Sequence, residues 1–316
     1  MTINFRKRIF GKAFDIYASE AFAGLVGESL NLYDDADCES ADVELHISGT
    51  DNIGVLSNNP KIYRKFANGF QANFGTCLVS WFRKEHSNKL FVRAEFNLFK
   101  LNSLLGFVKR LRSMEYPNEL ERFEQILYEL IIVPTVYMLP DTALMHAATL
   151  ASGGGAVTFT GTGGVGKSSA ILSAAHNQEF SFVSDDISVI NNKGRMFANF
   201  AWPKIYGYNC AGNQFKKLLL KDRSWIDRVH FTTKNARNPS SVRRKIRPEV
   251  LFNGRVAKEP LLKMVVLLFR EDVDSIKVGE LNRQAGLDMF LEVMMAEYQV
   301  FHKFINWEKY NSLGNI

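Results

Sequence analysis

Residues 161–168 read Gly161-Thr-Gly-Gly-Val-Gly166-Lys167-Ser168 and match the pattern G-x-x-x-x-G-K-[ST] at every fixed position. Glycines in this pattern let the backbone turn so that successive N–H groups point at phosphate oxygens. The lysine brings a positive charge to the phosphates, and the hydroxyl after it is a ligand for Mg²⁺. The sequence therefore predicts a nucleotide site formed by Gly161, Thr162, Gly163, Gly164, Val165, Gly166, Lys167, Ser168 and Ser169.

The segments on either side have the structure that this motif requires. Residues 156–160 read as a strand, and residues 169–176 are small and apolar enough for a helix whose N-terminus faces the phosphates. Upstream, the apolar run 144–150 and the turn Ser152-Gly-Gly-Gly155 predict a hairpin with that strand. Downstream, residues 180–184 read as a strand that ends in Asp185-Asp186, so two carboxylates are expected beside the loop for metal and proton chemistry.

The rest of the chain predicts a mixed α/β protein with two domains. Alternating or apolar runs at 42–48, 77–82 and 90–96 indicate strands, the last two as a hairpin. Apolar residues at three- and four-residue spacing predict a helix from Glu119 that ends at Pro134. Further patterns predict a hairpin over 187–200, a strand at 260–268 and helix over 284–310. We place a mixed α+β domain at 1–118 and the phosphate-loop domain at 119–316.

Composition excludes several classes of protein. The chain has 316 residues, of which 46% are hydrophobic, and it contains three cysteines at wide spacing. These values indicate a globular protein without a disulfide framework. Its longest apolar run, 127–139, is interrupted by Glu129 and Pro134, and Asp15 and Glu20 interrupt any signal sequence. We therefore expect no membrane span and a cytoplasmic location.

The net charge of +6 has a local origin, because the segment 234–258 holds eight basic residues and one acidic residue. Three interpretations stay open. Arg243, Arg244 and Arg247 could clamp phosphates or an acidic substrate, in a loop that is mobile before the ligand binds. The segment could be a solvated loop. It could bind nucleic acid, which is the least favoured interpretation because no aromatic residues are interleaved with the basic ones.

Taken together, the strand with His146-Ala-Ala, the loop 161–168, a short helix and Val183-Ser-Asp185-Asp186 resemble the HPr kinase/phosphorylase family. The resemblance covers roughly residues 120–200 and, more weakly, the rest of the C-terminal half. It implies a nucleotide-binding core related to ATP-dependent phosphoenolpyruvate carboxykinase. It also implies Asp185 as general base toward a serine hydroxyl, Asp186 as the carboxylate on the metal side, and His146 as a catalytic residue near the base.

The sequence also departs from that family. A Leu-Glu-(Val/Ile)-Arg-Gly string, which supplies a metal-binding Glu in HPr kinases, is missing after Gly194, so HPr itself and a reverse phosphorylase reaction are doubtful. The layout resembles HPr-kinase-related proteins, some of which phosphorylate a lasso-peptide precursor. We expect a kinase that uses ATP and Mg²⁺ and acts on a serine of a protein or peptide, and the resemblance implies a homo-oligomer. Alternatives are a nucleotide-binding switch or assembly ATPase and a kinase of a sugar or amino acid.

Overall fold

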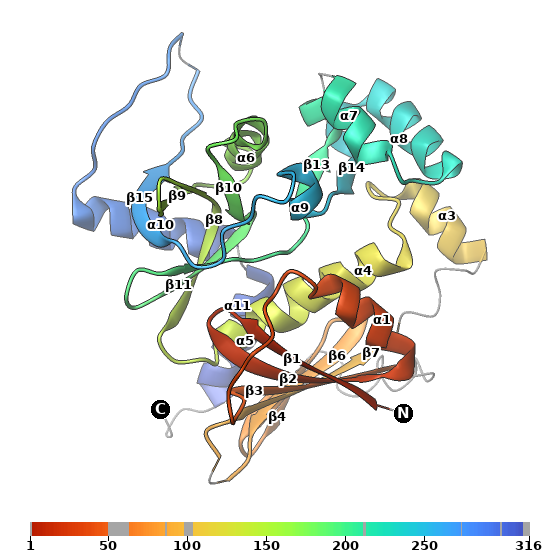
Figure 1. Ribbon diagram of the computed structural model, residues 1–316, viewed down its shortest axis with the longest axis vertical. Helices are drawn as coiled ribbons and strands as arrows, with labels where there is room; N and C mark the ends of the chain where they lie inside the picture. The colour runs from red at the N-terminus through yellow and green to blue at the C-terminus, as the bar shows by residue number, and fades with distance from the viewer. Residues whose placement is uncertain are drawn as a thin grey trace. The chain divides into compact units, whose positions relative to one another are not determined.

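The computed structural model describes residues 2–49, 63–85, 87–97, 104–210, 213–272, 274–297 and 299–311 (Figure 1). The fold is mixed α/β, as predicted. Its two compact units are each built from separate segments: Met1–Leu139, Lys204–Ile246 and Trp307–Ile316 form the first unit, and Pro140–Pro203 and Arg247–Asn306 form the second. This division differs from the single predicted boundary at residue 118, because residues 119–139 pack within the first unit.

A seven-stranded sheet forms the centre of the first unit. Its strands are β1 (Thr2–Ile9), β2 (Lys12–Ser19), β3 (Val43–Gly49), β4 (Tyr63–Phe66), β5 (Gly69–Asn73), β6 (Cys77–Arg83) and β7 (Leu90–Phe96), in the order β1-β2-β3-β7-β6-β5-β4. β3 pairs in parallel with β2 and β7, and the other pairs are antiparallel. The three strands predicted in this region and the β6–β7 hairpin are confirmed, whereas the β1–β2 hairpin was not predicted.

Helices α1 (Glu20–Ser29) and α4 (Glu119–Ile126) pack on this sheet through aromatic side chains. The ring centroid of Phe123 lies 5.1 Å from that of Phe96 and 5.9 Å from that of Phe22. Asn118 begins α4 with a capping box, in which its side chain accepts from the Glu121 N–H and the Glu121 carboxylate accepts from the Asn118 N–H. The local sequence thus fixes where α4 begins, and the aromatic cluster fixes which face it buries.

Pro134 does not end this helix. α4 continues through a π-helical turn, Leu127–Ile132, into α5 (Val133–Val136), and Pro134 lies in the first turn of α5. Before the proline, the Val133 N–H bonds to the Tyr128 carbonyl five residues back, so the hydrogen bonds have already left the α-helical pattern that a proline would interrupt. The Thr135 hydroxyl also donates to the Ile131 carbonyl at 2.7 Å. The predicted end was therefore wrong, because the change of helix type resets the hydrogen-bond pattern before the proline.

The remaining described elements of the first unit come from later in the chain. Apart from α3 (Leu104–Arg112), which precedes α4, they are β13 (Lys204–Tyr206), a 3-10 helix (Gly207–Cys210), α7 (Asn213–Leu220), α8 (Trp225–Arg237), a second 3-10 helix (Pro239–Ser241) and β14 (Arg243–Lys245), and β13 pairs with β14 antiparallel. Helix α11 (Gln299–Asn311) reaches this unit at its C-terminal end, where Tyr63 donates to the Glu308 carboxylate at 2.6 Å.

The second unit is built on a six-stranded sheet. Its strands are β8 (Thr142–Ser152), β9 (Gly155–Thr160), β10 (Ser181–Ser184), β11 (Ile187–Asn191), β12 (Met196–Phe197) and β15 (Leu261–Leu267), ordered β12-β11-β8-β9-β15 with β10 also paired to β8. Helices α6 (Lys167–Ala175), α9 (Pro248–Leu251) and α10 (Arg283–Glu297) complete it. The predicted β8–β9 and β11–β12 hairpins, the strand β15 and the helices α6 and α10 are confirmed.

The described part of the chain contains no helix that is both long and apolar enough to cross a bilayer.

The aromatic cluster gives a test of the first unit. Phe123 is fully buried, so Phe123→Ala should lower the free energy of unfolding by about 3–5 kcal/mol through lost burial and the cavity left behind. Urea unfolding followed by circular dichroism measures the change. Tyr310→Ala is the control, because Tyr310 is 73% exposed and its loss should change stability by less than about 0.5 kcal/mol. Equal effects of the two changes would contradict the packing described.

Candidate functional site

Three parallel strands of the second unit end at the same edge of the sheet. β9 and β10 both pair antiparallel with β8, and β15 pairs in parallel with β9. The glycine-rich loop follows β9, Asp185 follows β10, and Leu268 follows β15. His146 lies on β8 opposite Ile187, the first residue of β11. The pairing of β8 therefore brings together the predicted loop, both aspartates and His146.

Backbone geometry explains two of the loop glycines. Gly161 has φ 150°, and a Cβ atom there would lie 2.6 Å from the Leu268 carbonyl oxygen. Gly166 has φ 112° and is the N-cap of α6. Both conformations favour glycine. The glycine spacing of the sequence motif thus corresponds to a tight turn that leads directly from β9 into a helix.

Lys167 is buried and its ammonium group bonds to the loop itself. Nζ donates to the Gly161 carbonyl at 2.6 Å and to the Thr162 carbonyl at 2.8 Å. Burial lowers the pKa of Lys167, while the nearby carboxylates of Asp186, Glu297 and Asp185 act in the opposite direction. The other loop residues are more open: Thr162, Gly163, Gly164 and Ser169 are exposed, and Val165, Gly166 and Ser168 are half-buried.

The two aspartates differ in their surroundings. Asp185 is 6% exposed, and its Oδ1 accepts from the Ser168 hydroxyl at 3.3 Å. The Asp186 side chain is 54% exposed, and its Oδ1 lies 3.7 Å from His146 Nδ1. Asp186 also has φ 70°, a left-handed conformation that costs free energy in a residue other than glycine. This turn directs the second carboxylate away from the Ser168 pair and toward the histidine.

Glu297, which the sequence analysis did not identify, completes the cluster. It is the last residue of α10, and its Oε1 accepts from the Gly163 N–H at 2.7 Å. Its Oε2 lies 3.9 Å from His146 Nε2. No local pattern distinguishes this glutamate, because 134 residues separate it from Gly163. A carboxylate oxygen on a loop amide makes the contact that a phosphate oxygen would make, so the loop can hold an anion.

A buried hydroxyl network lies behind the site. Thr149 bonds to Thr158 at 2.9 Å and to Ser188 at 2.7 Å, and Ser188 bonds to Ser184 at 2.6 Å. These four residues lie on β8, β9, β11 and β10, so their hydroxyls join all four strands close to the edge where the aspartates lie. A satisfied buried network restricts the positions of its members. It therefore holds the backbone around Asp185 and Asp186 in place.

The basic segment is not the open loop that the phosphate-clamp and solvated-loop interpretations predict. Arg243 Nε donates to Glu115 at 2.5 Å, and Arg244, which is 1% exposed, donates to Asp227 at 2.7 Å. Arg247 lies over the Trp202 ring, 5.1 Å from its centroid. Instead of an open loop, residues 239–251 form a short 3-10 turn, β14 and α9. Arg243 and Arg244 are bound to carboxylates within their own unit, so we do not retain the phosphate clamp.

The carboxylates and histidine of the site do not form a complete metal centre by themselves. Across the residues that the structure describes, no three His, Cys, Asp or Glu side chains are grouped in a way that could hold a metal ion. The donors that the motif would offer to Mg²⁺ are the Ser168 hydroxyl and one aspartate.

Comparison with known proteins gives no further assignment. No protein-family model matches this chain, and no curated protein matches it significantly.

The Glu297 contact predicts how the loop competes for anions. The Glu297 carboxylate bonds to the Gly163 amide, so a polyphosphate that binds the loop must either displace this carboxylate or be repelled by its negative charge. Glu297→Gln should therefore strengthen the binding of inorganic tripolyphosphate about three- to tenfold, as measured by titration calorimetry. Glu292→Gln, an exposed change on the same helix, serves as the control and should leave affinity unchanged. Equal or weaker binding by Glu297→Gln would show that this carboxylate does not compete with anions.

Proposed function

We propose that the protein is an ATP- and Mg²⁺-dependent phosphotransferase that phosphorylates a hydroxyl group, with a serine of a protein or peptide as acceptor. The observation that carries the proposal is the joint position of a G-x-x-x-x-G-K-S loop between β9 and α6, a carboxylate on the loop serine, and a second carboxylate beside a histidine. The finer fold assignment, a core like that of HPr kinase and phosphoenolpyruvate carboxykinase, is part of the same proposal.

The residues of the loop fit a bound polyphosphate. Its backbone amides already hold one carboxylate, that of Glu297, and the Lys167 ammonium group lies at the base of the loop with two carbonyl oxygens as its hydrogen-bond partners. The nearby carboxylates of Asp186, Glu297 and Asp185 favour the charged form of Lys167, so this cation would bind the phosphates. When bound, Mg²⁺ would neutralise the charge of the phosphoryl group being transferred.

We assign the two aspartates the opposite roles from those that the family resemblance implies. Asp185 bonds to the Ser168 hydroxyl, which is the metal-binding group of the motif, so Asp185 and Ser168 would hold Mg²⁺ together. Asp186 is more exposed and lies beside His146, so it would accept the proton of the acceptor hydroxyl. His146 would orient Asp186 and stabilise its charge. Phosphoryl transfer depends mainly on positioning the reactants and on neutralising the charge of the phosphoryl group. These side chains, with Mg²⁺, would supply both.

The first experiment tests nucleotide binding. Lys167→Ala removes the cation of the loop and should weaken the binding of Mg·ATP at least tenfold, or about 1.4 kcal/mol, in titration calorimetry. Lys193→Ala is a matched control, because Lys193 lies on the exposed β11–β12 turn of the same unit. If a folded Lys167→Ala protein binds Mg·ATP as the wild type does, the loop is not the nucleotide site.

The second experiment tests the roles of the aspartates. The probe is an array of peptides with one serine each, incubated with γ-labelled ATP, with serine-to-alanine peptides as background. Asp186→Asn should lower the transfer rate by about 10²–10⁴-fold and change nucleotide affinity little, since an amide cannot accept the proton. Asp185→Asn should instead raise the Mg²⁺ concentration needed for half-maximal nucleotide binding. ATP hydrolysis without transfer to any peptide would favour a switch ATPase over a kinase.

A further inference from the structure

A groove between α3 and α8 of the first unit is separate from the residues discussed so far. It has a volume of about 290 Å³ and is lined by Leu111, Trp225, Val229, His230, Lys234 and Arg237, among others. Its apolar side chains are unusually open to solvent: Trp225 is 73% exposed and Val229 is 52% exposed. Trp225 and Val229 are four residues apart on α8, so they form one apolar ridge along the helix.

The groove is held in shape by polar contacts below it. Lys234 Nζ donates to the Arg112 carbonyl at 3.0 Å, and His230 Nε2 lies 3.1 Å from the Leu111 carbonyl, so both bind the end of α3 to α8. Arg244 donates to His230 Nδ1 at 2.8 Å. Because a guanidinium group only donates, His230 accepts at Nδ1 and carries its proton on Nε2. Burial lowers the pKa of His230, as do the charges of Arg244 and Lys234, which favours the neutral ring that the hydrogen bond from Arg244 requires.

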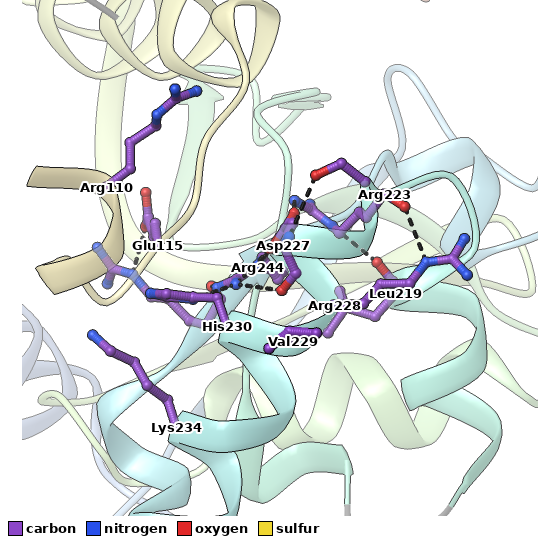
Figure 2. Close-up of polar contacts among 12 residues, drawn as sticks. Arg110, Glu115, Leu219, Arg223, Asp227, Arg228, Val229, His230, Lys234 and Arg244 are labelled. Atoms are coloured by element: carbon purple, nitrogen blue, oxygen red, sulfur yellow. Dashed lines mark hydrogen bonds and ion pairs between the residues drawn. The ribbon is translucent and has the colours of Figure 1, made fainter. Parts of the chain in front are cut away.

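A buried ion-pair network fixes Arg244 in turn. Asp227 accepts from Arg244 at 2.7 Å and from Arg223 at 2.9 Å, and Arg223 also pairs with Glu121. Figure 2 shows this cluster with Asp227, His230 and Lys234 on one helix and Arg244 against it. The only acidic residue of α8 is thus already paired within the protein.

The charge around the groove is therefore positive. α3 carries Lys109, Arg110 and Arg112, and α8 carries Arg228, Lys234 and Arg237. Lys234 bonds to neutral carbonyl groups, and within the described residues Arg237 has no ion-pair partner. Both cations lie in the last turn of α8, whereas Trp225 is its first residue. The groove consequently has an apolar end and a cationic end along a single helix.

We infer that this groove binds an acidic, amphipathic peptide segment of a partner protein, with apolar side chains against Trp225 and Val229 and carboxylates paired with Lys234 and Arg237. Charge complementarity favours an acidic ligand, and the exposed tryptophan and the arginine are residue types that dominate protein–protein interfaces. The groove is a hollow with a mostly apolar lining, and an inserted apolar side chain fills it better than a flat lipid surface or a phosphate backbone would. The inference does not depend on nucleotide binding by the second unit.

A selection of phage-displayed random 16-residue peptides on the wild-type protein tests this inference. Enriched peptides should be net negative, with apolar residues three and four positions apart. An enriched peptide should bind at least tenfold more weakly to Trp225→Ala and to Arg237→Glu, in fluorescence polarisation. The matched controls are Tyr310→Ala, at a site that is also 73% exposed, and Lys217→Glu, in the last turn of α7; each should change affinity less than twofold.

Three results would overturn the inference. The first is a selection without enrichment or with basic peptides. The second is an enriched peptide that the groove variants bind as well as the wild type does. The third is a protein that binds no peptide but sediments with phosphatidylglycerol vesicles, with the sedimentation lost in Trp225→Ala. That result would show that the groove binds a lipid surface instead.

Discussion

Strand β8 is hydrogen-bonded to β9, β10 and β11, and that pairing positions the glycine-rich loop, both aspartates and His146. Its C-terminal half pairs with β9 and β10, and its N-terminal half pairs with β11. Asp185 and Asp186 connect β10 to β11, so at these two residues the chain passes from the C-terminal half of β8 to its N-terminal half. The left-handed backbone of Asp186 makes that step, and the Ala147 N–H donates to the Asp186 carbonyl at 3.0 Å.

This geometry explains why the two aspartates, adjacent in sequence, have such different environments. Asp185 still follows the direction of β10 and stays buried beside α6, whereas Asp186 has left the sheet. The hydroxyl groups of Thr149, Ser184 and Ser188 lie directly behind the step and satisfy one another. The paired strands and the hydroxyl network hold the two aspartates next to each other. The left-handed backbone of Asp186 lets one carboxylate be exposed to solvent while the other is buried.

The parts of the fold that sequence analysis predicted are those with a local cause. The alternating or apolar strands depend on residues a few positions apart and were confirmed, and the backbone conformation explains the loop glycines. The Asn118 capping box is equally local but was not predicted. Pairing over long distances was not predictable. The basic segment looked unbalanced because Glu115 and Glu124, which neutralise Arg243 and Lys245, lie more than 100 residues earlier in the chain. Glu297 escaped notice for the same reason, and the aspartates could be located but not distinguished.

The way the chain alternates between the two units has a consequence for synthesis. Five consecutive segments belong alternately to the first and second units. The N-terminal sheet is therefore translated early, but its contact between Tyr63 and Glu308 forms only after the second unit has left the ribosome. During translation the first unit lacks helices α7 and α8 and strand β14 until residues 213–245 have emerged from the ribosome. Cutting the gene at any single point would thus separate parts of the first unit, because its segments lie before, between and after those of the second unit.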